Sequence, residues 1–256
     1  MWVAVAVAAV AVVAAAAWLV TRGSRGKSAA RLEIEVELNG AKKALLCSLR
    51  DEELEQAAQC MAEAFQDSPW WAYIARDRQG AARRALLAFV FERNMRAMLE
   101  RDPHAVLGLR DAQGMACTFM LCSPATRRLS TWSKVRAGLL WLPLCFGAGC
   151  MWRLLAVAAW TEDAERRALG AAAAAAAWQV QRMVVAPRCQ GRGVGSACLA
   201  AALRHRVPAG HTVALSTNEP RNVLFYRRLG FAVVAEEHAP PELDSIRNCD
   251  LTWTAP

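Results

Sequence analysis

The stretch that decides the fold spans residues 180–203 and is VQRMVVAPRCQGRGVGSACLAAAL. Its apolar residues predict a strand over 179–185, and the pattern that follows predicts a helix over 193–206. Residues 190–195, QGRGVG, join the two elements. Glycines at such a junction let backbone amides approach an oxyanion closely, and the positive end of the helix dipole stabilises its charge. The stretch therefore predicts a phosphate-binding loop.

Three phosphate-binding patterns compete for this loop. The Walker loop needs Lys after its last glycine, but Ser196 follows Gly195. The dinucleotide pattern GxGxxG needs glycine or alanine where Ser196 stands, and an acidic residue at the end of the next strand, where Ser216 stands. The third pattern, Q/R-x-x-G-x-G/A, is met without exception by Gln190, Gly193 and Gly195.

The third pattern resembles the pyrophosphate loop of the GNAT superfamily of acyl-CoA-dependent N-acyltransferases, and further matches flank it. Residues 218–231, NEPRNVLFYRRLGF, are similar to the second signature of the family, in which a helix bearing Asn and Tyr ends at Leu-Gly-Phe. Residues 62–74, AEAFQDSPWWAYI, are similar to the first helix region of a GNAT subgroup. The resemblance covers roughly residues 41–256. It implies an α/β fold with a central, splayed, mixed sheet flanked by helices.

The resemblance also implies a site for acetyl-CoA as cosubstrate. Pantetheine would lie where the strands 179–185 and 212–216 splay apart, and backbone amides of the loop would bind the pyrophosphate, with Arg188 and Arg192 adding charge. Tyr226 would protonate the departing CoA thiolate, although a tyrosine next to Phe225 could also merely pack. The cofactor-binding residues implied are Met183, Val184, Val185, Gln190, Gly191, Arg192, Gly193, Val194, Gly195, Ser196, Asn222 and Tyr226.

A general base is not evident from the sequence. Many relatives carry a glutamate on the fourth strand, whereas residues 178–182 are WQVQR and contain no carboxylate. Glu162 and Glu165 precede this strand, but a solvated helix face is the expected place for both. The histidines His205, His211 and His238 are expected at the surface, which leaves water to take the proton of the acceptor amine.

Two functions follow from these residues. The first is an N-acetyltransferase that moves an acetyl group from acetyl-CoA to a primary amine, of a small molecule or a protein, by direct attack in a ternary complex. The alternative is a catalytically weak, acyl-CoA-binding, GNAT-like module that regulates or scaffolds at a membrane. The missing strand carboxylate favours the alternative, whereas the intact loop and Tyr226 favour the enzyme. The identity of the acceptor is not predicted.

Charge and cysteine content exclude two other classes of protein. The formal net charge is +8, from 31 basic and 23 acidic residues, and suits polyanionic partners. No ribbon of aromatic and basic residues is present, so no nucleic acid is expected as a partner. The nine cysteines include no CxxC pair, so no metal is expected and small buried thiols in a reducing compartment are favoured.

The N-terminal segment predicts a membrane anchor. Residues 1–20 contain no charged residue, and an apolar helix of about 20 residues can span a bilayer. Trp2 and Trp18 would lie near its two interfaces, and the basic residues that follow place the catalytic domain on the cytoplasmic side. The expected organisation is a single-pass anchor over 1–20, a basic linker with an extra strand over 21–40, and a GNAT domain over 41–256.

A second apolar segment, residues 137–152, is expected to be a buried or membrane-surface helix beside the acceptor site. It is shorter than a full span and contains Pro143 and three glycines. A single crossing there would also separate two strands, 115–121 and 180–185, that should be neighbours in one sheet.

The remaining pattern predicts alternating strands and helices. Residues 32–38 and 43–47 predict a hairpin, and residues 249–254 predict a closing edge strand. The other expected strands are 104–109, 115–121, 212–216 and 231–235, and the other expected helices are 49–65 (starting from Ser48 and Asp51), 81–99 and 221–229.

Overall fold

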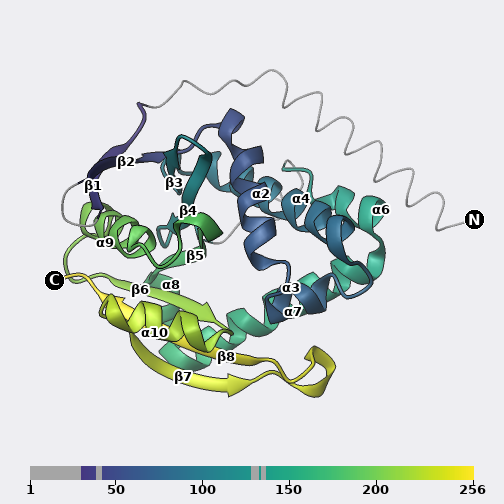
Figure 1. Cartoon of the computed structure of the whole chain (residues 1–256). Helices are drawn as coiled ribbons and strands as arrows, with labels where there is room; N and C mark the ends of the chain where they lie inside the picture. The colour runs from purple at the N-terminus through teal and green to yellow at the C-terminus, as the bar shows by residue number, and fades with distance from the viewer. Residues whose placement is uncertain (1–29, 39–41, 128–132, 134–136) are drawn as a thin grey trace, which may run out of the picture.

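A computed structural model of the chain describes residues 30–38, 42–127, 133 and 137–256. It contains one eight-stranded sheet and the helices that pack on it (Figure 1). The strands are β1 (Glu33–Leu38), β2 (Lys42–Ser48), β3 (Val106–Asp111), β4 (Gly114–Cys122), β5 (Trp178–Val185), β6 (Thr212–Thr217), β7 (Ala232–His238) and β8 (Arg247–Thr254).

The longer helices are α2 (Leu54–Phe65), α4 (Gly80–Leu99), α7 (Ala148–Leu169), α9 (Val194–Arg206) and α10 (Pro220–Arg228). Short helices connect them: η1 (Asp51–Glu53), α3 (Pro69–Ile74), η2 (Leu139–Trp141), α6 (Leu142–Phe146), α8 (Ala171–Ala176), η3 (Pro187–Cys189) and η4 (Pro241–Leu243).

The sheet is mixed, with strand order β1-β2-β3-β4-β5-β6-β8-β7. Only β5 and β6 are parallel, and all other neighbours are antiparallel. The parallel pair is short, because register holds only at Trp178 with Val213 and at Gln179 with Ala214. Beyond these pairs the two strands separate, so the splayed mixed sheet that the sequence predicts is confirmed.

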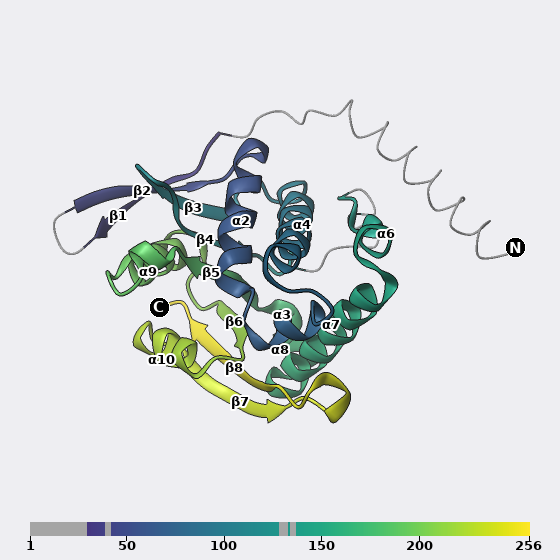
Figure 2. The same cartoon turned by 45° about the vertical axis from the view of Figure 1, so that its right-hand side comes forward.

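Helices cover both faces of the sheet and make two cores. On one face, α2, α3, α4 and α7 enclose a core around Met61 and Phe91, and on the other α9 encloses a core around Leu199. Strand β4 supplies both, because alternate side chains of a strand point to opposite faces: Met120 joins the first core and Phe119 the second. Figure 2 shows β4 and β5 between α2 and α9.

A β-bulge interrupts β5 where it faces the gap. Thr118 pairs with Val184 and Met120 with Gln181, so Arg182 and Met183 together oppose Phe119 alone. Arg182 has a φ of 50°, in the left-handed region that non-glycine residues seldom adopt. The bulge therefore changes which way the side chains of β5 point at the splay.

The predicted elements are confirmed in order and type, with two corrections at their ends. Residues 249–254 do not form an edge strand, because β8 lies between β6 and β7 and buries its residues 248–251. The first long helix starts as η1 at Asp51 rather than at residue 49. Ser48 belongs to β2, where its hydroxyl accepts the Leu32 amide, and Glu53 instead accepts the Arg50 amide at the helix start.

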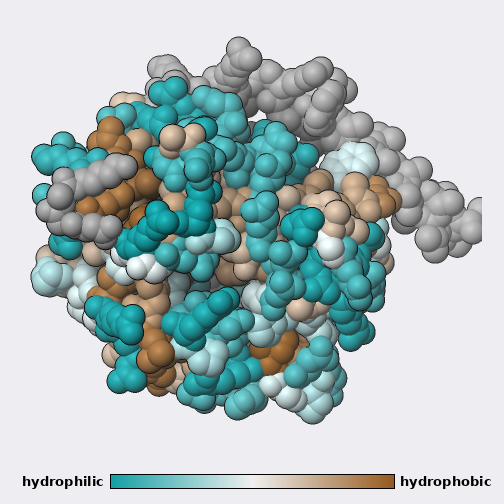
Figure 3. Space-filling model, in the orientation of Figure 1, coloured by the Kyte–Doolittle hydropathy of each residue, from teal (hydrophilic) through white to brown (hydrophobic). Residues whose placement is uncertain are grey.

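Residues 137–152 do not form one helix. Pro143 lies in the first turn of α6, and Gly147, with a φ of 90°, ends that helix before α7 begins. Trp141 and Leu144 are exposed, and Figure 3 shows apolar atoms over α6 at the edge of the molecule. The expected neighbours 115–121 and 180–185 are paired as β4 and β5, which is confirmed.

The prediction of a single-pass membrane protein is corrected here. In the part of the chain that the structure describes, no helix is both long enough and apolar enough to cross a bilayer. The segment expected as the anchor, residues 1–20, lies outside the described residues.

Candidate active site

The predicted phosphate loop forms a turn that leads directly into α9. Gly191 and Gly193 have φ values of 71° and 72°, which glycine adopts without strain, and Gly193 is the N-cap of the helix. Among the described residues, no backbone hydrogen bond uses the amides of Val194, Gly195 or Ser196. The positive end of α9 therefore presents unpaired N–H donors, which is the geometry that binds an oxyanion.

Gly195 allows the first turn of α9 to lie against β5. A Cβ atom at this position would be 2.7 Å from Val185 Cγ2 and 3.3 Å from Met183 Cε. Both distances are too short for a side chain, so glycine is required for this approach. The loop is thereby joined to the strand that borders the splay.

The end of β5 presents its peptide groups to the gap. The Ala186 amide donates to the Ala116 carbonyl at 2.9 Å, so the Val185 peptide groups, one residue earlier, point away from β4. The Gln190 side chain donates to the Val185 carbonyl at 3.0 Å and fixes the loop to the strand.

The two arginines of the loop differ in what they contact. Arg188 donates to Asp111 at 2.8 Å and to the Met115 carbonyl at 3.2 Å, and this hydrogen bond lowers the pKa of the Asp111 carboxyl. Arg188, which was expected to add charge at the pyrophosphate, is thus paired with Asp111. Arg192 is exposed next to the loop amides.

A cavity of about 380 Å³ opens at the splay between β5 and β6. Of the residues predicted from sequence, Met183, Asn222 and Tyr226 line it, and the loop residues 190–196 do not. Its wall is completed by polar residues of β5, of β6 and the residue that follows it, and of β8, and by apolar residues of α3 and α7. Among them are Trp70, Trp71, Ile74, Leu154, Val157, Gln179, Gln181, Arg182, Ser216, Asn218 and Asn248.

Tyr226 combines ring packing with access to this cavity. Its ring makes T-shaped contacts with Phe225 and Phe231, at centroid distances of 5.0 and 5.6 Å. Burial raises the pKa of the Tyr226 phenol well above its ordinary value, so the hydroxyl stays protonated at any physiological pH. Within the described residues this hydroxyl has no hydrogen-bond partner, although Tyr226 lines the cavity. It is a proton donor without an acceptor.

A buried carboxyl group behind the cavity was not predicted from the sequence. Asp250 is only 2% exposed, and it accepts hydrogen bonds from Ser216 Oγ at 2.5 Å and from Asn248 Nδ2 at 3.1 Å. Burial raises the pKa of Asp250, and the nearby Glu165 charge raises it further. Ser216 and Asn248 both line the cavity, so Ser216 connects it to a basic carboxylate.

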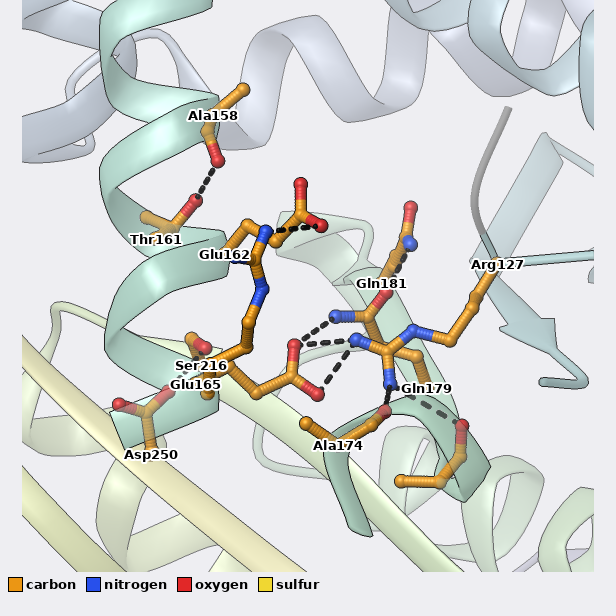
Figure 4. A network of polar contacts seen from close by, with 12 residues as sticks. Arg127, Ala158, Thr161, Glu162, Glu165, Ala174, Gln179, Gln181, Ser216 and Asp250 are labelled. Carbon is orange, nitrogen blue, oxygen red and sulfur yellow. Dashed lines mark hydrogen bonds and ion pairs between the residues drawn. The ribbon is translucent and has the colours of Figure 1, made fainter. Parts of the chain in front are cut away.

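Glu165 is a second buried carboxyl group at the cavity, and its expected place was wrong. It was expected on a solvated helix face, yet only 4% of the residue is exposed, because α7 turns this side toward the sheet. Arg127 binds both of its carboxylate oxygens, at 2.5 and 2.6 Å, and also the carbonyls of Ala174 and Ala177 (Figure 4). Gln179 adds a donor at 3.2 Å. With both oxygens engaged, Glu165 is held as an ion-pair partner.

The other candidate bases lie as the sequence predicts. Glu162 lines the cavity, is partly exposed and pairs with Arg166 at 2.9 Å. His205, His211 and His238 are exposed and do not line the cavity. Across the described ranges, no three His, Cys, Asp or Glu side chains are grouped to hold a metal ion.

Comparison with known proteins agrees with this architecture. The profile of the family described as acetyltransferase (GNAT) domain matches residues 152–233. The protein described as "histone acetyltransferase HPA2 and related acetyltransferase" from Corynebacterium glutamicum is 15% identical, with a TM-score of 0.50; 82% of this chain and 95% of that chain are covered. An Aedes aegypti protein assigned as arylalkylamine N-acetyltransferase 7 is 13% identical, with a TM-score of 0.52 and coverage of 88% and 93%. At these identities the likeness shows the fold.

One explanation accounts for the loop, the second signature, the splayed sheet and the family match. Residues 152–233 match the GNAT acetyltransferase domain, the described chain has the fold of that superfamily, and both findings support an acyltransferase.

Proposed function

We propose that this protein transfers an acetyl group from acetyl-CoA to a primary amine. One observation carries the proposal: the unpaired amides that open α9 lie against β5, and β5 borders the cavity that the protonated, unpartnered Tyr226 lines. A phosphate-binding turn beside a proton donor matches what a CoA thioester requires at its two ends. One end of acetyl-CoA carries the pyrophosphate, and the other end carries the thioester, whose sulfur must leave.

The cofactor would run from the loop along β5. The amides of residues 191–196 bind the pyrophosphate, whereas the Gln190 amide donates to the Pro187 carbonyl, and exposed Arg192 adds charge there. The backbone of Met183, Val184 and Val185 borders the pantetheine, with the Val185 peptide groups facing the gap. Asn222 on α10 lies on the opposite wall, where its side chain donates to Thr217 Oγ1 at 3.2 Å.

Transfer proceeds by direct attack of the amine in the ternary complex. The nitrogen lone pair forms a bond with the thioester carbon, the carbon–sulfur bond breaks, and Tyr226 gives its proton to the departing sulfur. A raised pKa suits this role, because the phenol keeps its proton until negative charge develops on sulfur. The acid is thus present before each turnover and acts at the leaving group.

The proton of the acceptor amine leaves through Ser216. Its hydroxyl lines the cavity and donates to Asp250, so Ser216 can accept a proton from the amine as it passes its own to the carboxylate. Burial raises the pKa of Asp250 and makes it a better base than an exposed aspartate. The pair supplies the base that the strand 178–182 lacks.

Incubation of the full chain with acetyl-CoA and a panel of primary amines tests the proposal. We expect free CoA thiol and acetylated amine to form in equal amounts, detected by thiol titration and mass spectrometry. Tight acetyl-CoA binding with no transfer to small amines, lysine peptides or peptide N-termini would overturn it in favour of a binding module.

A further inference from the structure

The cavity contains a cation that no carboxylate neutralises. Arg182 lines it, and within the described residues its guanidinium forms no ion pair. Nη1 donates to Asn94 Oδ1 at 2.8 Å and to Gln181 Oε1 at 3.1 Å, both neutral acceptors. Nε is buried without a partner, and Nη2 forms no hydrogen bond among the residues that the structure describes.

The other charges of the cavity are already paired. Arg127 is neutralised by Glu165, and Glu162 pairs with Arg166. Burial lowers the pKa of Arg182 to about 10, which still leaves it charged at neutral pH. The cavity therefore carries one uncompensated positive charge, and the edge of the guanidinium formed by Nε and Nη2 has no acceptor.

Arg182 is fixed in place on the side of the sheet away from the phosphate loop. Its guanidinium lies 5.6 Å from the Trp71 ring centroid and 5.4 Å from that of Phe91, on α3 and α4. Met183, the next residue, points the other way, toward α9. Because of the bulge in β5, Arg182 and Met183 point to opposite faces of the sheet. The cation therefore faces the part of the cavity that pyrophosphate does not enter.

We propose that the amine acceptor carries a carboxylate that binds Arg182 at its free Nη2. This inference rests on the acyltransferase function proposed above and names its class of acceptor. A guanidinium N–H is a charge-assisted donor to a carboxylate oxygen, and the rings of Trp71 and Phe91 keep the cation in one orientation. Trp70 and Leu154 add apolar wall, so the acceptor is an amino acid with an apolar side chain.

Matched pairs of acceptors test this directly. We would compare kcat/KM for L-phenylalanine and L-leucine with that for their α-carboxamides, which keep the amine and the side chain but lack the charge. The parent protein should prefer each acid by about 10- to 100-fold, the value of a charge-assisted hydrogen-bonded pair. Arg182→Gln should reduce the ratio of acid to amide toward unity, and Arg182→Lys should retain part of it.

Arg93→Gln is the matched control. The Arg93 guanidinium also lies over a phenylalanine ring, 5.2 Å from the Phe89 centroid. Unlike Arg182, Arg93 does not line the cavity. The ratio of acid to amide should stay at the parent value in this variant. Acetyl-CoA titration of Arg182→Gln and Arg182→Lys shows whether each variant is folded and competent to bind the donor.

The outcomes separate this inference from the proposed function. Transfer to acids and amides at equal kcat/KM in the parent overturns the role of Arg182 and leaves the acyltransferase intact. Transfer to no amine of either kind overturns the proposed function itself. A preference for the acid that survives in Arg182→Gln places the carboxylate elsewhere and also contradicts the inference.

Discussion

Ser216 on β6 donates a hydrogen bond of 2.5 Å to the carboxylate of Asp250 on β8, directly across the antiparallel pair. Ser216 faces the cavity, whereas Asp250 is buried behind it. Figure 4 shows the two side chains pointing toward one another beside Glu165. A hydroxyl at the surface of the cavity is thereby linked to a carboxylate whose pKa burial raises, and from this link we expect the rate of transfer to depend on pH.

As the pH is lowered, the rate of transfer should begin to fall at a pH above the usual titration range of an aspartate. Asp250 acts as base only when ionised, and its raised pKa means that protonation begins at a higher pH. kcat/KM measured against pH should therefore decline as pH falls through this pKa. Asp250→Asn should lose that limb and most of the rate, and Ser216→Ala should lose rate as well. An unchanged acid limb in Asp250→Asn would assign the titration to another group.

The raised pKa of Asp250 should also make the free energy of unfolding depend on pH. A carboxyl group whose pKa is raised on folding binds its proton more tightly in the folded state, so folding is favoured as pH falls through the folded pKa. The free energy of unfolding of the parent, relative to Asp250→Asn, should increase over that range and level off below the unfolded pKa. Urea unfolding at several pH values measures this difference. A difference independent of pH would mean that burial does not perturb Asp250.

Tyr226→Phe should lower kcat by about 100-fold or more, because it removes the proton donor and keeps the ring that packs on Phe225 and Phe231. The affinity for acetyl-CoA should be unchanged. Tyr73→Phe is the control: this second tyrosine donates to the Glu242 carbonyl at 2.8 Å and does not line the cavity. It should keep the parent kcat. Equal kcat in Tyr226→Phe and the parent would remove the hydroxyl from the mechanism.

The buried ion pair Arg127–Glu165 should matter for stability chiefly because removal of either partner leaves the other charge unpaired. Both side chains are almost fully buried, so removal of one leaves a charge without its partner. Arg127→Met or Glu165→Met should each lower the free energy of unfolding by about 3–5 kcal/mol. The double variant Arg127→Met with Glu165→Met should be more stable than the sum of the single changes predicts, as a double-mutant cycle would show. Strict additivity would contradict coupling between the two.

Local sequence was enough to predict the loop, α9 and Tyr226, because each depends on residues close together in the chain. Gln190, Gly193 and Gly195 fall close together in the chain, and the φ of 72° at Gly193 is a local requirement that glycine meets. The strands and most helices were predicted for the same reason, from periodicity along short segments.

The rest of the site depends on contacts between distant residues. Glu165 is buried only because Arg127, 38 residues away, closes against it, and Asp250 meets Ser216 only because β8 inserts next to β6. The sequence contained a signal for Arg182, a charged residue inside a strand of eight residues, but its orientation depends on the bulge opposite Phe119. None of these contacts follows from periodicity.

The central claim is that the turn before α9 binds the pyrophosphate of acetyl-CoA, and one titration tests it. Gly193 has a φ of 72°, which Asn and Asp tolerate better than most other residues, so Gly193→Asn and Gly193→Asp strain the backbone alike and differ by one negative charge. A carboxylate at an N-cap stabilises a helix, so the Asp variant should fold. Isothermal titration with acetyl-CoA should show binding weakened by about 100-fold or more in Gly193→Asp relative to Gly193→Asn, because like charges meet at the loop. Equal affinity in the two variants would contradict the claim.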